Sequence, residues 1–233
     1  MIIKEKVFIV TGGSSGIGRE TAAQLVKRGA KVAITGRDAE KLRRVANELG
    51  AMAIHADVSS EAGIHKTMEE TLAAFGAVHG LINNAGHGWS RKVGEYTWQD
   101  FEEIYKTNVF GAAMMGQAAA EYFKEQRYGN IVNVASTAAL KGYAGGGIYS
   151  SSKFALRGIT QCWQAELRPV NIRVIGVNPS VVITAVGQPG RVEREEVSNK
   201  LRGEEIAHAI VSALEMDDRG YVPELTVHAT NPF

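Results

Sequence analysis

The stretch Val7-Phe-Ile-Val-Thr-Gly-Gly-Ser-Ser-Gly-Ile-Gly18 joins a short apolar run to a glycine-rich turn. Residues 19–28 then carry apolar side chains at helical spacing, and Gly29 follows as a helix stop. The order is strand, glycine turn and helix. In such a turn three glycines allow a tight bend, close approach of a pyrophosphate and packing of helix on strand. We assign these roles to Gly12, Gly16 and Gly18.

This context favours a phosphate-binding turn, with backbone N–H groups and the positive helix end facing the phosphates. A glycine loop that serves only as a turn is the alternative, because isolated glycine-rich loops are common. The strand before it and the helix after it argue against that alternative.

Short apolar runs and amphipathic segments alternate along the rest of the chain. Further strands are predicted at 31–35, 51–56, 78–82, 130–135, 171–177 and around 224–228. Helices are predicted at 39–49 (capped by Asp38 and closed by Gly50), 60–75, 100–126, from Tyr149 onward and at 204–214. Strands separated by helices form parallel sheets with helices on both faces. We therefore predict an α/β fold, a doubly wound, mostly parallel seven-stranded sheet of the Rossmann type, forming a single domain over residues 1–233 with a short substrate loop at about 185–203.

Tyr149 and Lys153 stand four residues apart where this helix begins. Both side chains should leave the same helix face, one turn apart. A free phenol keeps its proton up to a pH of about 10. A nearby ammonium group favours the phenolate, so we expect Lys153 to lower the pKa of Tyr149 and suit it to proton transfer. A solvated helix edge is the alternative for this pair.

Bulk properties argue against several classes of protein. The 26 Lys+Arg residues nearly balance the 25 Asp+Glu residues, so nucleic acid or an anionic membrane surface is not expected as a partner. Cys162 is the only cysteine, and its apolar helical surroundings suggest a small core residue. The six histidines show no metal-ligand spacing, and we expect no metal. Without a long apolar stretch or a signal-peptide pattern, a cytoplasmic location is expected.

Four motifs together resemble the short-chain dehydrogenase/reductase family. They occur in the family's order and at similar spacings: TGGSSGIG at 11–18, Asn83-Asn-Ala-Gly86, Ser136, and Tyr149 with Lys153. The similarity runs from Lys6 to about Val186. It implies a carbonyl or alcohol substrate and hydride transfer with a nicotinamide dinucleotide.

The resemblance implies the catalytic residues Asn108, Ser136, Tyr149 and Lys153. Tyr149 would exchange a proton with the substrate oxygen, Ser136 would hold and polarise that oxygen, and Lys153 would bind the nicotinamide ribose. In relatives, an asparagine at the position of Asn108 distorts its helix and holds a water that connects the lysine to solvent. A turn serine is the alternative for Ser136.

The resemblance also implies the cofactor contacts. Asp57 and Val58 would meet the adenine, although Asp57 also suits a helix cap. The remaining contacts are Gly12, Ser14, Ser15, Gly16, Ile17, Gly18, Arg37, Asn84, Ala85, Gly86, Tyr149, Lys153, Pro179, Val182 and Thr184.

Arg37 decides the expected cofactor. An acidic residue at the end of the second strand would bind a ribose 2′-hydroxyl, but here the chain reads Thr35-Gly-Arg37. An arginine fork suits a 2′-phosphate, so NADP(H) is favoured, while NAD(H) stays open. Asp38 weakens this preference unless it caps the following helix. A solvated surface arginine is the alternative.

Substrate and assembly are less defined by the sequence. Ser180 replaces the glycine that the family usually has after the proline, which changes the pocket beside the nicotinamide. The chain end lacks the tail usual in 3-oxoacyl-carrier-protein reductases, although that activity stays an alternative, as does a non-catalytic NADP(H)-sensing protein. Helical segments around 111–120 and 154–163 resemble family subunit interfaces, so a homodimer or homotetramer is expected. A moderately apolar pocket would be edged by His87, Trp89, Ala138, Leu140, Tyr143 and Val186.

Overall fold

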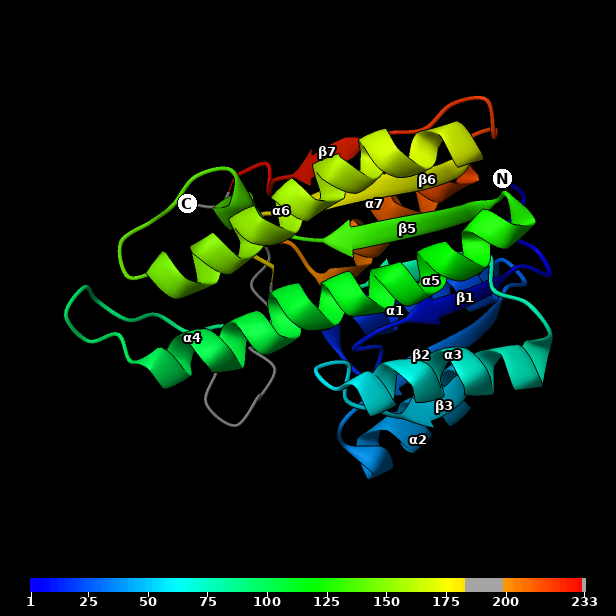
Figure 1. Cartoon of the computed structure of the whole chain (residues 1–233), viewed down its shortest axis with the longest axis horizontal. Coiled ribbons are helices and arrows are strands. Elements are labelled where there is room, and N and C mark those ends of the chain that lie inside the picture. Colours follow the sequence, from blue (N-terminus) through cyan, green and yellow to red (C-terminus); the bar gives the residue numbers. More distant parts are fainter. Residues whose placement is uncertain (183–198, 232–233) are drawn as a thin grey trace.

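A seven-stranded parallel sheet forms the centre of the computed structural model, which describes residues 1–182 and 199–231 (Figure 1). Its strand order is β3-β2-β1-β4-β5-β6-β7, and every neighbouring pair is parallel. The strands are β1 (Val7–Val10), β2 (Lys31–Gly36), β3 (Met52–His55), β4 (Gly80–Asn83), β5 (Gly129–Val134), β6 (Ile172–Pro179) and β7 (Glu224–Val227). The order reverses beside β1, which creates the switch point where ligands bind in such sheets.

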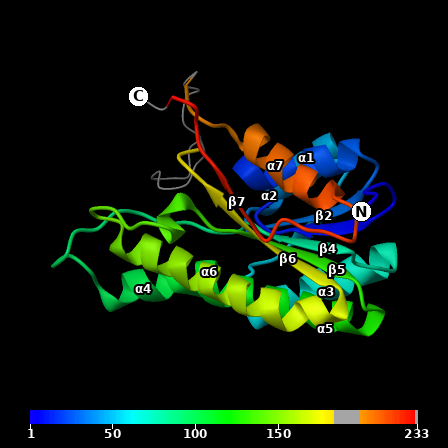
Figure 2. The same ribbon diagram turned by 90° about the horizontal axis from the view of Figure 1, so that it is seen from above.

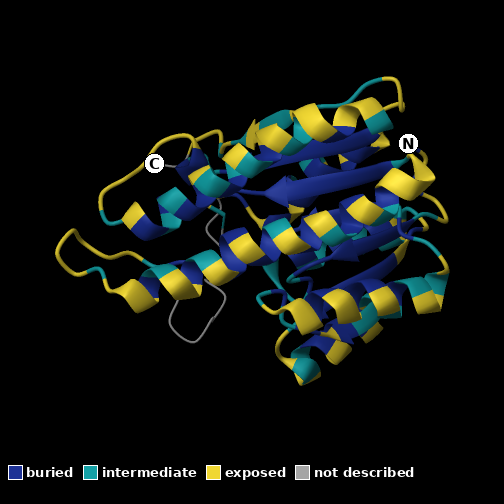
Figure 3. Ribbon diagram, in the orientation of Figure 1, coloured by how far each residue is buried: buried dark blue, intermediate teal, exposed yellow. Residues whose placement is uncertain are grey.

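Helices cover both faces of the sheet (Figure 2). They are α1 (Gly16–Lys27), α2 (Ala39–Leu49), α3 (Glu61–Phe75), α4 (Trp98–Tyr105), α5 (Ala112–Gln126), α6 (Gly147–Leu167) and α7 (Gly203–Glu215). One apolar cluster joins α1, α2 and α7 to one face, and a second joins α3, α5 and α6 to the other. β1, β4, β5 and β6 are buried along their whole length and β2 is buried except at its ends, as their near-continuous apolar sequences require, whereas the edge strands β3 and β7 are mostly half-buried (Figure 3). The predicted fold class is confirmed.

The local signals in the sequence account for several helix ends. Asp38 caps α2, because its carboxylate accepts hydrogen bonds from the backbone N–H groups of Glu40 and Lys41. Gly50 closes the same helix in the left-handed conformation, with φ at 69°. Both agree with the prediction.

The predicted continuous helix over 100–126 is wrong in its middle. α4 begins at Trp98, and a π-helical segment, η1 (Lys106–Gly111), separates it from α5. Asn108 lies inside this segment, where the wider turn marks a local distortion typical of functional sites.

The expected core position of Cys162 is also wrong, because its side chain is exposed. Thr160, two residues earlier on α6, faces the buried side. Two residues turn a helix by roughly 200°, which carries Cys162 to the opposite face.

Candidate active site

The glycine turn between β1 and α1 has the conformation that the sequence predicts for it. Gly12 and Gly16 have φ values of 64° and 52°, a region that favours glycine. Ser15 is the N-cap of α1 but makes no side-chain capping bond among the described residues, and the first turn carries no acidic side chain. The first N–H groups of a helix have no partner within that helix, so the amino end of α1 offers donors and a positive field of the kind that fits the phosphates of a dinucleotide.

Asn84 holds this turn from the neighbouring strand. Its Nδ2 donates to the carbonyls of Thr11 at 3.0 Å and Gly12 at 3.3 Å. A Cβ on Gly18 would lie 2.4 Å from that same Nδ2. Gly18 therefore also leaves room for the Asn84 side chain, in addition to the helix packing predicted for it. The cofactor contact predicted for Asn84 stays a prediction, and in this structure its side-chain amide holds the glycine turn.

Arg37 follows the end of β2 and is exposed. A Cβ on Gly36 would lie 3.2 Å from Oγ of Ser14, so the serine of the glycine turn and the strand end are neighbours. His55 lies on the other side, with Nε2 2.9 Å from the carbonyl oxygen of Arg37. Asp38 is engaged in capping α2, and Arg37 beside it carries a guanidinium, a group of the type that suits a phosphate.

Asp57 follows β3 and accepts a hydrogen bond from the Ser59 backbone at 2.9 Å, while Ser60 is the cap of α3. Burial acts to raise the pKa of Asp57, but the Ser59 hydrogen bonds, with the charges of Arg37 and Lys106, hold it below its usual value. A carboxylate that stays ionised suits an acceptor role toward an amino group.

Tyr149 and Lys153 occupy the first turns of α6, and the Lys153 Nζ lies 5.8 Å from the centre of the Tyr149 ring. Lys153 is only 5% exposed, and its Nζ donates to the carbonyl of Val134 at 3.0 Å. Ser136, two residues beyond Val134, shares a hydrogen bond with the Tyr149 hydroxyl and accepts another from the Ala138 backbone. The carboxyl end of β5 and the amino end of α6 thus bring the three predicted side chains together.

The direction expected for the Tyr149 pKa is wrong in this structure. Burial raises the pKa of Tyr149 to about 12, with the Ser136 hydrogen bond opposing this rise and the Tyr143 charge adding to it. Burial likewise lowers the pKa of the Lys153 amine to about 8. Desolvation disfavours the charged form of both groups and is the largest cause of each pKa shift.

Asn108 connects α6 to the loop after β4. Its Oδ1 accepts from the backbone N–H of His87 at 3.0 Å, and its Nδ2 donates to the His87 carbonyl at 2.8 Å. The same Nδ2 donates to Oγ of Ser152 at 3.1 Å. A Cβ on Gly86 would lie 3.1 Å from the Asn108 Oδ1 and 3.4 Å from the Lys153 Nζ. The Asn108 side chain therefore has direct partners that tie two segments of the site.

The segment after β6 is described only in part. The Ser180 N–H donates to the carbonyl of Val227 at 2.8 Å, which holds this residue beside β7. Val182 forms an isolated bridge with Leu201, and Pro179 ends β6. Thr184, Val186 and most of the predicted substrate loop lie outside the described residues.

The residues predicted to edge a pocket have mixed positions. Ala138 is buried, whereas Leu140 and Tyr143 are exposed, and the ring centres of His87 and Trp89 lie 5.7 Å apart. Gly88, between the last two, was missed. Its backbone lies against the Tyr149 ring. A loop glycine carries no sequence signal for such a contact.

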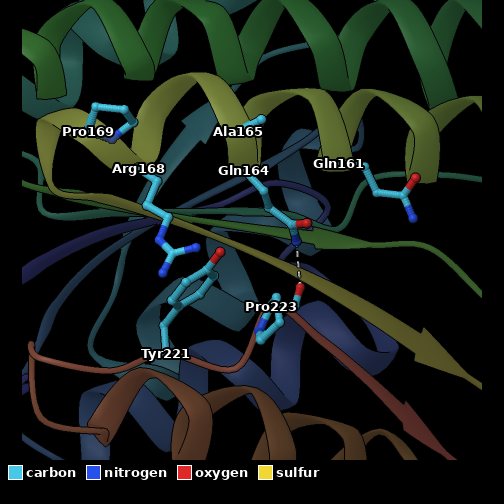
Figure 4. Close-up of a pocket in the computed structure, with 7 residues that line it drawn as sticks. All are labelled: Gln161, Gln164, Ala165, Arg168, Pro169, Tyr221 and Pro223. Carbon is cyan, nitrogen blue, oxygen red and sulfur yellow. Dashed lines mark hydrogen bonds between the residues drawn. The ribbon is translucent and has the colours of Figure 1, made fainter.

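A surface hollow away from this site is lined by the end of α6 and by the segment before β7 (Figure 4). Gln161 lies twelve residues after Tyr149 on α6, which is about 18 Å along the helix axis. Gln164 spans the hollow and donates to the carbonyl of Pro223 at 2.6 Å. The hollow therefore shares no residue with the predicted chemistry.

In 1–182 and 199–231, no three His, Cys, Asp or Glu side chains cluster in a way that would hold a metal ion. Over the same ranges, none of the helices has the length and apolar character needed to cross a membrane.

Comparisons with known proteins agree with this geometry. Residues 6–195 match the family model described as short chain dehydrogenase. An uncharacterized oxidoreductase of Staphylococcus epidermidis is 30% identical over 227 residues, covering 97% of both chains. Among solved structures, an alcohol dehydrogenase from Thermococcus sibiricus, complexed with 5-hydroxy-NADP, superimposes with a TM-score of 0.90 at 27% identity, covering 97% of both chains. A 3-ketoacyl-(acyl-carrier-protein) reductase from Brucella melitensis, complexed with NADH, gives a TM-score of 0.87 at 29% identity, covering 98% of both chains.

The family match covers most of the chain and includes the glycine turn, Ser136, Tyr149 and Lys153. The chain belongs to the short-chain dehydrogenase/reductase family.

Proposed function

We propose that this protein is an oxidoreductase that transfers a hydride between NADP(H) and a carbonyl compound or secondary alcohol, with Tyr149 as the general acid and base. The observation that carries the proposal is the convergence of Tyr149, Ser136 and the buried amine of Lys153 at the carboxyl end of β5. The glycine turn, with an amino helix end suited to phosphates, lies at the carboxyl end of β1, which β4 separates from β5. When bound, the nicotinamide ring supplies or accepts the hydride.

The side chains have separate tasks in this reaction. The Ser136 hydroxyl donates to the substrate oxygen and polarises its bond to carbon. In reduction, Tyr149 gives its proton to that oxygen as negative charge develops on it. In oxidation, the Tyr149 phenolate removes the alcohol proton. A pKa of about 12 keeps Tyr149 protonated at neutral pH, so the proton donor for reduction is in place. Lys153 binds the ribose hydroxyls and adds positive charge beside the phenol.

Screening ketones, aldehydes, quinones and a 3-oxoacyl thioester for oxidation of NADPH and NADH tests the proposal directly. We expect turnover with at least one class, measured by the loss of nicotinamide absorbance. Turnover of the thioester alone would favour a 3-oxoacyl-carrier-protein reductase, the activity named for the Brucella melitensis relative. Tight NADPH binding without turnover of any class would favour a cofactor-sensing protein on the same fold.

We propose NADP(H) over NAD(H) because Arg37 directly follows Gly36, the residue that lies against Ser14 of the glycine turn, while Asp38 is engaged as a helix cap. Replacing Arg37→Ala should lower the preference for NADPH over NADH by about tenfold to a hundredfold, since a charge-assisted bond to the 2′-phosphate would be lost. Dissociation constants for both cofactors measure this. Arg43→Ala, which removes an exposed arginine from α2, is the matched control. An unchanged ratio of the two constants in the Arg37 variant would make Arg37 a surface residue.

We also propose self-association through the outer faces of η1, α5 and α6, where exposed residues recur (Figure 3). The apolar side chains of Phe110, Met114 and Phe154 are 58%, 41% and 44% exposed there. Large apolar side chains gathered on one surface are typical of subunit contacts. Sedimentation analysis should give a dimer or tetramer, and Phe154→Glu should shift it toward monomer. A monomeric wild-type protein at micromolar concentration would contradict this proposal.

A further inference from the structure

Gly88 lies against the catalytic tyrosine. A Cβ built on Gly88 would lie 2.3 Å from Cδ2, 2.9 Å from Cγ and 3.1 Å from Cε2 of Tyr149. Contacts below 3.0 Å are essentially never observed for a Cβ. Gly88 is buried, so the ring packs on bare backbone at a point that solvent does not fill.

The atoms involved show which motions would relieve the contact. Rotation of the ring about the Cβ–Cγ bond moves Cδ2 and Cε2 but leaves Cγ in place. A side chain at position 88 therefore cannot be accommodated by turning the ring alone. Either the whole Tyr149 side chain changes its χ1 rotamer, or the loop moves away from α6.

The loop is held where it is by Asn108. The side-chain amide of Asn108 binds both the N–H and the carbonyl of His87, the residue before Gly88. Asn108 also donates to Ser152, whose hydroxyl donates to the backbone carbonyl of Tyr149 at 2.7 Å. The loop and the first turn of α6 are thus connected through one side chain on η1.

The other end of this loop meets Lys153. A Cβ built on Gly86, two residues before Gly88, would lie 3.4 Å from the Lys153 Nζ. The backbone from Gly86 to Gly88 therefore follows α6 from the amine of Lys153 to the ring of Tyr149. We propose that this backbone, held by Asn108, is a template that positions the Tyr149 ring, and that Gly88 is a positioning residue for the reaction. This inference rests on the proposed function.

Gly88→Ala tests the proposal. We expect kcat to fall at least tenfold, because displacement of a reacting group by about 1 Å can reduce a rate about a hundredfold. The dissociation constant for NADPH should change less than twofold, since the glycine turn and Arg37 are untouched. This split separates positioning from a general loss of structure. Gly158→Ala on α6, where a Cβ meets no atom within 4 Å, is the matched control and should keep wild-type kcat.

A second measurement serves if Gly88→Ala proves unstable. The loss of melting temperature caused by Gly88→Ala should disappear when Tyr149→Ala removes the ring, because the clash then has no partner. An equal loss in both backgrounds would overturn the proposed contact. Wild-type kcat in Gly88→Ala would overturn its positioning role.

The proposed function can fail separately. If Tyr149→Phe keeps full turnover, the acid–base assignment is wrong, whatever Gly88→Ala does. If Tyr149→Phe is inactive and Gly88→Ala is fully active, the assignment stands and only the template is rejected.

Discussion

Replacing Tyr149→Phe should lower kcat by at least about a hundredfold while NADPH affinity stays nearly constant, because positioned general acids contribute about 10²–10⁴ in rate. The substitution removes only the hydroxyl, and the ring can keep its contact with Gly88. The neighbouring Ser136 loses one hydrogen-bond partner but keeps the Ala138 backbone N–H. Single-turnover measurements with saturating NADPH would separate the chemical step from cofactor binding.

Tyr122→Phe is the control for this experiment, because it removes a helical tyrosine hydroxyl on α5, outside the candidate site. It should turn over like wild type. Retained turnover in Tyr149→Phe would exclude the phenol as the proton donor and would leave Ser136 or a bound water as the candidate donor.

The fold could be predicted because its signals are local. Alternating apolar runs, Asp38 at a helix start and Gly50 at a helix end each lie within a few residues of the structure they determine. The end of β6 shows the limit. Asn178 and Pro179 pair with Thr226 and Val227, almost fifty residues later. The local sequence predicts that the strand ends at residue 177, and residues 178–179 belong to it because they pair with the distant β7.

The sequence predicted which residues form the candidate site, but it did not predict how deeply they are buried. The spacing of Tyr149 and Lys153 correctly placed both on one helix, yet the expected lowering of the Tyr149 pKa was wrong. Burial of both groups depends on the ends of β4 and β5 and on the loop at Gly86–Gly88. Those segments lie outside α6 in the sequence. An argument from the Tyr149–Lys153 pair alone therefore omits burial, which has the larger effect on both pKa values. Gly88 was missed for the same reason.

The substitution Lys153→Met should abolish most turnover. It should also remove the part of the pH dependence of the unfolding free energy that Lys153 causes. The Lys153 amine has a pKa of about 8 in the folded protein, against 10.5 as its ordinary value. Between these two pH values the unfolded chain binds more protons than the folded chain, so wild-type stability should rise with pH. The gain across this interval is on the order of 3 kcal/mol, and the variant should not show it, because a methionine side chain has no proton to lose.

Urea unfolding of both proteins at pH 7, 8, 9 and 10 measures this difference. Tyr149, with its pKa raised to about 12, acts in the opposite direction above pH 10, because the unfolded phenol then loses its proton first. That contribution is common to both proteins and largely cancels in their difference. At pH 7 the variant should be about as stable as wild type. Removing a buried charge is favourable, but it leaves the Val134 carbonyl without the Lys153 donor, which costs about 1–3 kcal/mol.

The combined result separates the two reasons for which a lysine could occupy this position. If Lys153 were chiefly a structural residue, its replacement would lower stability at every pH and the loss of turnover would follow unfolding. A stable and inactive variant, with the pH-dependent gain confined to wild type, would instead mean that the protein tolerates an unfavourable buried amine for the sake of its chemistry. Parallel stability curves for the two proteins between pH 8 and 10 would show that Lys153 titrates near its ordinary value, and the argument from burial would then be wrong.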